Sequence, residues 1–195
     1  MIARPHAVLA AAFAAVCLSI AGCGSGNAPH RTLAEVTPDL TGADPRLVAL
    51  YSQSNEILGG GKPAFQARMK ELRGLPIVVN IWGSWCAPCV AEAPALEQSA
   101  KQLGNRVAFI GVNIEDRAED VKKFQARYPQ AYPSYDDPDR EIASSLIAVK
   151  AQPFTNIYDA SGRLVHTEGG PYKSAAALDA DIERYAGPLK ADPGN

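Results

Sequence analysis

The chain has 195 residues, of which 47% are hydrophobic and 21% are charged, a balance typical of one folded globular domain. The 19 basic and 21 acidic residues give a net charge of −2, so the basic excess that nucleic-acid binding requires is absent. Four cysteines and three histidines are too few for a disulfide scaffold or for most closed zinc sites.

Residues 1–22 are predicted to be a lipoprotein signal peptide. Arg4 precedes an uncharged stretch, Ala7 to Ala21, that suits a signal-peptide hydrophobic region and is too short to span a membrane. The stretch runs into Ile-Ala-Gly-Cys23, which resembles a bacterial lipobox, so Cys23 is expected to carry the lipid anchor, with acyl chains such as palmitate. A plain secretory signal with an incidental cysteine is the alternative. Export would place the domain outside the cell membrane, where disulfides persist.

Residues 23–43 are predicted to form a flexible tether, because they are polar and contain several glycines and prolines. When extended, such a segment reaches roughly 50–60 Å. The folded domain is expected to span residues 44–190 and to begin with a helical extension over residues 44–73.

Two helices are expected in this extension. Asp44-Pro45 has the form of an N-cap followed by proline at the first helical position. Apolar residues at helical spacing, including Ile57 and Leu58, predict a first helix that Gly59-Gly60-Gly61 ends. A second, shorter helix is expected to end at Gly74.

Two nearly continuous apolar runs, Ile77–Trp82 and Val107–Val112, are typical of strands that are covered on both faces. An amphipathic helix is expected between them, which makes a β-α-β unit. Further helices are expected around Val121–Tyr128 and Asp139–Leu146. A hairpin of Phe154–Tyr158 and Arg163–Thr167 and a last helix complete the pattern. The sequence therefore predicts an α/β fold with a central mixed sheet flanked by helices.

Cys86 and Cys89 are separated by two residues and stand directly after a buried strand, at the start of a helix. The first helical turn brings both sulfur atoms within bonding distance. The free N–H groups and partial positive charge of the helix N-terminus favour a thiolate at Cys86, which we expect to be the exposed nucleophile. Cys89, one turn deeper, is the expected resolving thiol.

Metal binding is the main rival to this redox chemistry. A zinc site needs about four ligands, and the chain has no second cysteine pair. A Cu(I) site of Cys86, Cys89 and His166 stays open as an alternative, because soft thiolates select Cu(I). A purely structural disulfide would close a tiny loop and stabilise little. We expect no bound metal and no cofactor beyond the redox-active disulfide.

The segment Val78 to Pro94, Val-Val-Asn-Ile-Trp-Gly-Ser-Trp-Cys-Ala-Pro-Cys-Val-Ala-Glu-Ala-Pro, resembles the TlpA/ResA group of extracytoplasmic thiol–disulfide oxidoreductases. Gln152-Pro153-Phe154-Thr155 stands where that family has its cis-proline loop. The resemblance implies a thioredoxin-like fold from about Pro76 to the last helix. The segment before Pro76 departs from it, since the family often has a β-hairpin there.

The resemblance also assigns roles. Asn80 stands where cytoplasmic thioredoxins have a buried aspartate, so another acid must help Cys89 lose its proton. Glu92 is the candidate, because it lies three residues after Cys89 on the same helix face; a solvated surface glutamate is the alternative. The substrate-binding surface is expected to comprise Trp85, Ala87, Pro88, Gln152 and Pro153. Asn156 departs from the family, and His166 is expected to be half exposed without a role.

The expected activity is therefore that of a membrane-tethered, monomeric protein-disulfide reductase. Its expected partners are thiols of exported proteins, such as apocytochrome c, and a membrane thiol reductant of the DsbD/CcdA type. An oxidant that forms disulfides and a Cu(I)-delivery lipoprotein are the alternatives. A peroxidase is disfavoured, because the chain lacks the Thr-x-x-Cys type of site with a distant resolving cysteine.

Overall fold

One mixed sheet forms the centre of the protein in this computed structural model, which describes residue 1, residues 31–147 and residues 152–189. Its strands in the described part have the order β1-β4-β3-β2-β5-β6. Neighbouring strands from β1 to β2 are parallel, whereas β5 is antiparallel to β2 and β6 to β5. The bounds are β1 Ile57–Leu58, β2 Ile77–Trp82, β3 Ala108–Ile114, β4 Ser134–Asp137, β5 Phe154–Tyr158 and β6 Leu164–Gly169.

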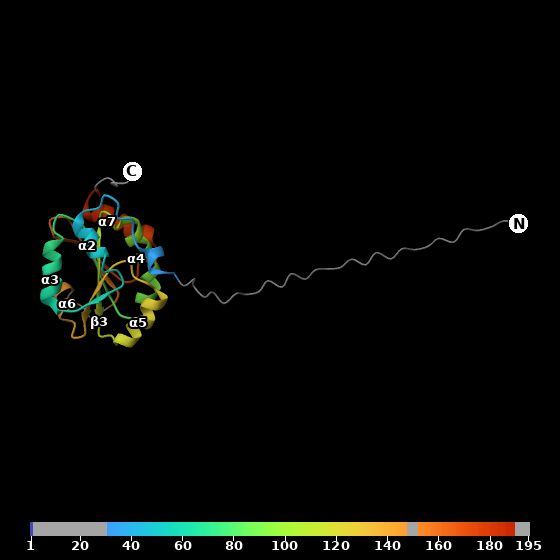
Figure 1. Cartoon of the computed structure of the whole chain (residues 1–195), viewed down its shortest axis with the longest axis horizontal. Coiled ribbons are helices and arrows are strands. Elements are labelled where there is room, and N and C mark those ends of the chain that lie inside the picture. The colour runs from blue at the N-terminus through green and yellow to red at the C-terminus, as the bar shows by residue number, and fades with distance from the viewer. Residues whose placement is uncertain (2–30, 148–151, 190–195) are drawn as a thin grey trace.

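Helices cover both faces of this sheet (Figure 1). Helices α3 and α6 lie together on one side, and α4 and α5 lie on the other, where α7 packs against α4. The bounds are α1 Leu33–Val36, α2 Pro45–Tyr51, α3 Gly61–Glu71, α4 Ala87–Leu103, α5 Ala118–Arg127, α6 Glu141–Leu146 and α7 Ala175–Ala186. The predicted α/β architecture with a mixed central sheet is confirmed.

The two central strands, β2 and β3, are buried along their whole length. They pair in parallel from Ile77 opposite Ala108 to Trp82 opposite Asn113. Their apolar runs fit this position, because helices on both faces remove both sets of alternating side chains from water. The β-α-β unit therefore fixes where β2 ends and α4 begins.

The predicted first helix is wrong beyond Tyr51, because Ile57 and Leu58 form the edge strand β1 instead. A turn with Asn55 at φ +64° redirects the chain. β1 then pairs in parallel with β4, a short strand that the sequence analysis missed. Its sequence, Ser-Tyr-Asp-Asp, has no apolar run that would have indicated a strand.

The predicted tether is also shorter than expected, because residues 31–43 lie against the domain. Val36 is completely buried. The Lys101 ammonium of α4 donates to the Glu35 carbonyl at 2.5 Å, and Arg31 pairs with the buried carboxylate of Glu97 on the same helix. Residues 23–30, including Cys23, lie outside the described residues. In the part of the chain that the structure describes, no helix has the length and apolarity to cross a bilayer.

Candidate functional site

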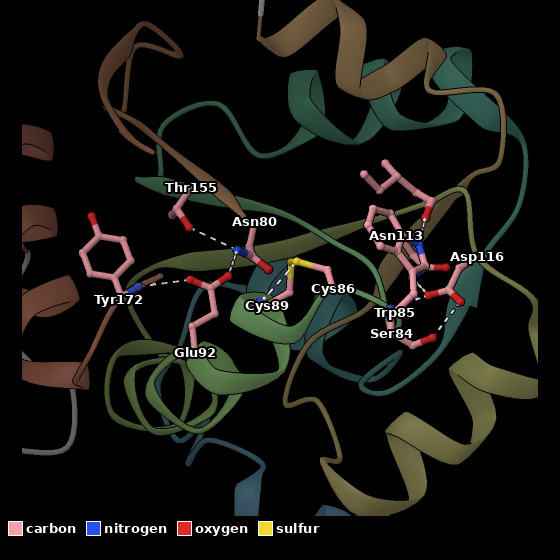
Figure 2. Close-up of a disulfide and its surroundings, with 11 residues drawn as sticks. Asn80, Ser84, Trp85, Cys86, Cys89, Glu92, Asn113, Asp116, Thr155 and Tyr172 are labelled. Atoms are coloured by element: carbon pink, nitrogen blue, oxygen red, sulfur yellow. Dashed lines mark hydrogen bonds between the residues drawn. A yellow bond between two sulfur atoms is a disulfide. The ribbon is translucent and has the colours of Figure 1, made fainter. Parts of the chain in front are cut away.

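The two cysteines of the predicted redox pair lie at the N-terminus of α4, joined by a disulfide (Figure 2). β2 ends at Trp82, a three-residue loop follows, and Cys86 is the N-cap of the helix. The Cys86 sulfur accepts a hydrogen bond from the Cys89 backbone N–H at 3.3 Å. Pro88 fits the first turn, where its missing N–H costs nothing. The local arrangement thus agrees with the sequence prediction.

The expected exposure of Cys86 is wrong, since both cysteines are buried and Cys86 is only 5% exposed against 2% for Cys89. The residues around them, Trp85, Ala87 and Pro88, are the exposed ones. Because Cys86 is the N-cap and Cys89 lies inside the first turn, Cys86 is the cysteine nearer the start of the helix. Trp85, Ala87 and Pro88 therefore form the exposed surface beside the disulfide.

The loop before Cys86 is held by the carboxylate of Asp116, which follows β3. It accepts hydrogen bonds from the Ser84 backbone N–H at 2.5 Å and from the Ser84 hydroxyl at 2.7 Å. The Asn113 side chain donates to the same carboxylate at 3.0 Å. Sequence reasoning missed Asp116, although parallel β2 and β3 end at the same edge of the sheet, and that topology could have indicated it.

Trp85 is 53% exposed, and its indole N–H donates to the Ile114 carbonyl at 3.3 Å. In Figure 2 the ring lies on the opposite side of the disulfide from Glu92. Gly83 allows this, because a Cβ there would lie 2.7 Å from the indole nitrogen. The exposed ring borders an open groove of about 590 Å³ that also includes Val90 and Phe124.

Glu92 is completely buried behind the disulfide, which rules out the solvated-surface interpretation. One carboxylate oxygen accepts from the Asn80 side chain at 2.8 Å, and the other accepts from the Tyr172 backbone N–H at 3.1 Å. Asn80 also donates to the Thr155 hydroxyl at 3.1 Å. The carboxylate is therefore tied to the central strand on one side and to the segment before α7 on the other (Figure 2).

Burial raises the pKa of Glu92 to about 7, and the hydrogen bonds from Asn80 and Tyr172 only partly offset it. A small cavity of about 10 Å³ is lined by Cys89 and Asn80 among others. Such a volume is close to what one water molecule needs. Near neutral pH the site therefore has a carboxyl group that can both take up and release a proton.

The Gln152-Pro153 peptide bond is cis, as predicted. Because Phe154 pairs with Ile81 in the antiparallel β2–β5 register, this loop lies at the same end of β2 as the disulfide. With the Gln152 amide oxygen turned toward Arg140, the guanidinium donates to it at 2.7 and 2.8 Å. Arg140 is only 6% exposed and also pairs with Glu115 at 2.9 Å. No sequence signal marked this arginine as a buried support of the loop.

The two residues left without a role have definite surroundings. Asn156 is buried in β5, where its side chain accepts from the Thr167 hydroxyl at 2.8 Å and donates to the Leu146 carbonyl at 3.3 Å. It therefore links the hairpin to the end of α6. The ring of His166 stacks on Tyr185 of α7. The structure thus places His166 against the last helix, and it gives the Cu(I) alternative with Cys86 and Cys89 no support.

The fold and the cysteine pair define a thioredoxin-like protein, and a family comparison agrees: residues 63–173 match the AhpC/TSA family, to which the chain belongs. It is 36% identical over 101 residues to the thiol:disulfide interchange protein DsbE of Xylella fastidiosa, covering 51% of this chain and 50% of that protein. It is 27% identical over 146 residues to the thiol-disulfide oxidoreductase ResA of Geobacillus kaustophilus, covering 73% of this chain and 79% of that protein.

Solved structures give the same picture. A secreted Mycobacterium tuberculosis disulfide oxidoreductase homologous to E. coli DsbE is 26% identical with a TM-score of 0.53, over 59% of this chain and 85% of that one. A thioredoxin-family thiol:disulfide interchange protein from Chlorobium tepidum is 26% identical with a TM-score of 0.55, over 60% and 84%. The chain spans about half the length of the DsbE relatives from Xylella fastidiosa and Paracoccus denitrificans.

The raised pKa of Glu92 predicts a pH-dependent stability. A carboxyl whose pKa is about 7 in the folded state and about 4.5 in the unfolded state contributes stability that is complete below pH 4.5 and is lost as pH rises to 7. Over that window the oxidised wild type should lose about 3 kcal/mol relative to Glu92→Gln. Urea unfolding of both proteins from pH 4.5 to pH 8 measures the difference, and a constant difference would contradict it.

Proposed function

We propose that the protein is a thiol–disulfide oxidoreductase that exchanges electrons with other proteins through the Cys86–Cys89 pair. The observation that carries the proposal is the position of this disulfide. It lies at the N-terminus of a 17-residue helix, between exposed residues on its outer side and a buried carboxyl group behind it. The similarity to DsbE and ResA proteins supports the same chemistry.

In the proposed reaction the Cys86 thiolate attacks one sulfur of a substrate disulfide. The substrate S–S bond breaks, a mixed disulfide forms, and one substrate sulfur leaves as a thiolate. Cys89 then loses its proton and attacks the Cys86 sulfur, which releases the second substrate sulfur. Two electrons have passed to the substrate, and the protein holds the disulfide seen in the structure.

Glu92 is the proposed acceptor of the Cys89 proton. With a pKa of about 7 it is ionised in part of the molecules at neutral pH and can act as a base. Cys89 and Asn80 line the same small cavity, and the Asn80 amide donates a hydrogen bond to the Glu92 carboxylate. Asn80 holds the carboxylate in place but takes no proton itself.

We infer that the physiological direction is reduction. Ala87 and Pro88 supply no positive charge that would stabilise a thiolate, and the buried Glu92 carboxylate disfavours one. A less stable thiolate favours the disulfide form of the protein, which makes the dithiol a better electron donor. The proposed substrates are disulfides of exported proteins, such as apocytochrome c, and a membrane protein of the DsbD/CcdA type is the proposed donor.

Trapping of a mixed disulfide with glutathione tests which cysteine reacts first. Reduced Cys89→Ser protein, incubated with oxidised glutathione at mildly acidic pH, should form a stable mixed disulfide at Cys86. Because the helix N-terminus favours the Cys86 thiolate, the early yield should be roughly tenfold higher than for Cys86→Ser. Intact-mass spectrometry measures the adduct. An equal or higher yield in Cys86→Ser would overturn the assignment of the nucleophile.

The redox potential tests the direction. Equilibration of the wild type with glutathione buffers should give a potential well below about −180 mV, toward the roughly −270 mV of thioredoxin. Glu92→Gln should move the potential upward, because removal of the carboxylate stabilises the thiolate. A wild-type potential above about −180 mV would identify an oxidant or isomerase, and the reductive role would then be dropped.

We also propose that the protein is held at the outer face of the cell membrane by acylation of Cys23. Support comes from the Ile-Ala-Gly-Cys sequence and from the family's extracytoplasmic members. Cys23→Ser should move the protein from the membrane fraction to the soluble fraction of lysed cells, whereas Cys17→Ser should leave it in the membrane fraction. Equal partitioning of the wild type and Cys23→Ser would refute the anchor.

A further inference from the structure

Three side chains with metal-ligand atoms meet where α7 packs against β6, the strand at one edge of the sheet. His166 and Glu168 are two residues apart on β6 and therefore point to the same face of the strand. Asp181 comes from α7, which packs on that face. The ligand atoms of the three side chains lie within 4.8 Å of one another, and this is the one such group among the described residues.

The imidazole of His166 is packed against α7, and its Nε2 atom lacks a hydrogen-bond partner. Its ring is stacked on Tyr185, with 4.2 Å between centroids and 2° between planes. The Nε2 atom is buried and has no hydrogen-bond partner. It lies 3.6 Å from a carboxylate oxygen of Glu168 and 3.6 Å from one of Asp181, too far for a hydrogen bond to either. A buried polar atom without a hydrogen bond destabilises the folded state, so a ligand bound to this nitrogen would remove that penalty.

The spacing suits a cation between the three groups. Zn²⁺ binds histidine nitrogen at 2.0–2.1 Å and carboxylate oxygen at 2.0–2.2 Å, usually as a tetrahedron. Two ligands of such a tetrahedron lie roughly 3.3–3.5 Å apart, and the two observed nitrogen–oxygen distances are 3.6 Å. The Glu168 side chain is 42% exposed and that of Asp181 27%, so an ion can enter from solvent and keep water as its fourth ligand.

Asp181 is positioned as a ligand by a second contact. The Tyr172 hydroxyl donates to Asp181 Oδ2 at 3.0 Å and so orients the carboxylate from outside the cluster. Hydrogen bonds of this kind to ligating groups commonly orient metal ligands. A mixed nitrogen and oxygen donor set also discriminates, since Mg²⁺ and Ca²⁺ prefer oxygen ligands alone.

We propose that His166, Glu168 and Asp181 form a binding site for one zinc-type divalent cation, separate from the dithiol. From the sequence alone, no bound metal and no role for His166 are expected. Such an ion would join β6 to α7. Tyr172 would connect the ion to the active site, because its hydroxyl donates to Asp181 and its backbone N–H donates to Glu92. The competing interpretation is a protonated His166 that forms ion pairs with the two carboxylates.

Calorimetric titration of the full, oxidised protein with zinc chloride tests the proposal. The oxidised state is required, because a reduced dithiol would itself bind zinc through its thiolates. One zinc ion should bind per chain, and magnesium should not compete. His166→Gln and Glu168→Gln should each weaken binding at least roughly tenfold, because loss even of a residue that only orients a metal ligand costs about 10–100-fold in affinity. Glu183→Gln, an exposed carboxylate on the same helix, and His30→Gln are matched controls that should bind like the wild type.

The change in Tm caused by zinc is an independent readout, because each variant is compared with itself in the absence of zinc. Zinc at a hundredfold excess over the wild-type dissociation constant should raise the wild-type Tm by roughly 5–10 °C, and it should raise the Tm of His166→Gln by at most about half as much, because a tenfold weaker site is stabilised about half as strongly at the same zinc concentration. Absence of binding to the oxidised wild type would overturn the site and support the ion-pair interpretation. Undiminished binding in both His166→Gln and Glu168→Gln would place the metal elsewhere. Neither result bears on the dithiol chemistry.

Discussion

The hydrogen bond from Asn80 to Glu92 joins the central strand to the active-site helix, and much of the site depends on it. A carboxyl group without solvent is costly to bury unless its oxygens are paired. Here Asn80 pairs one oxygen and the Tyr172 backbone N–H pairs the other. The same Asn80 amide contacts Thr155 of β5. One buried acid thus requires β2, β5, α4 and the segment before α7 to keep fixed relative positions.

The disulfide is supported on its other side by a different carboxylate. Asp116 binds the loop that leads into Cys86, and its position follows from the parallel pairing of β2 and β3. Arg140 supports the Gln152 side chain in the cis-proline loop. The exposed residues Trp85, Ala87 and Pro88 therefore lie on a loop that Asp116 binds and at the start of a helix that Glu92 ties to the central strand. Preorganisation of this kind limits the motion that substrate binding must freeze.

The central β-α-β unit and the cysteine pair could be predicted from sequence, because long apolar runs and helical periodicity carry strong signals. Strands β1 and β4, on one side of the sheet, could not: β1 has two residues, and β4 is Ser-Tyr-Asp-Asp. Their pairing rests on long-range backbone hydrogen bonds that no local pattern encodes. The spacing of Glu92 from Cys89 put it on the right helix face. Its complete burial depended on the sheet and on Tyr172, eighty residues later in the chain. The buried position of Arg140 gave no sequence signal, since arginine is usually exposed.

The packing of residues 31–43 against the domain changes how far the protein can work from its anchor. With Cys23 acylated as proposed, only residues 23–30 lie between the lipid and the first described contact, that of Arg31 with Glu97. Eight residues span at most roughly 26–29 Å, about half the reach expected of a longer tether. A tether this short confines the dithiol to a thin layer above the bilayer. Encounters with a membrane-embedded electron donor then occur at a high effective concentration, whereas encounters with freely diffusing thiols gain nothing from it.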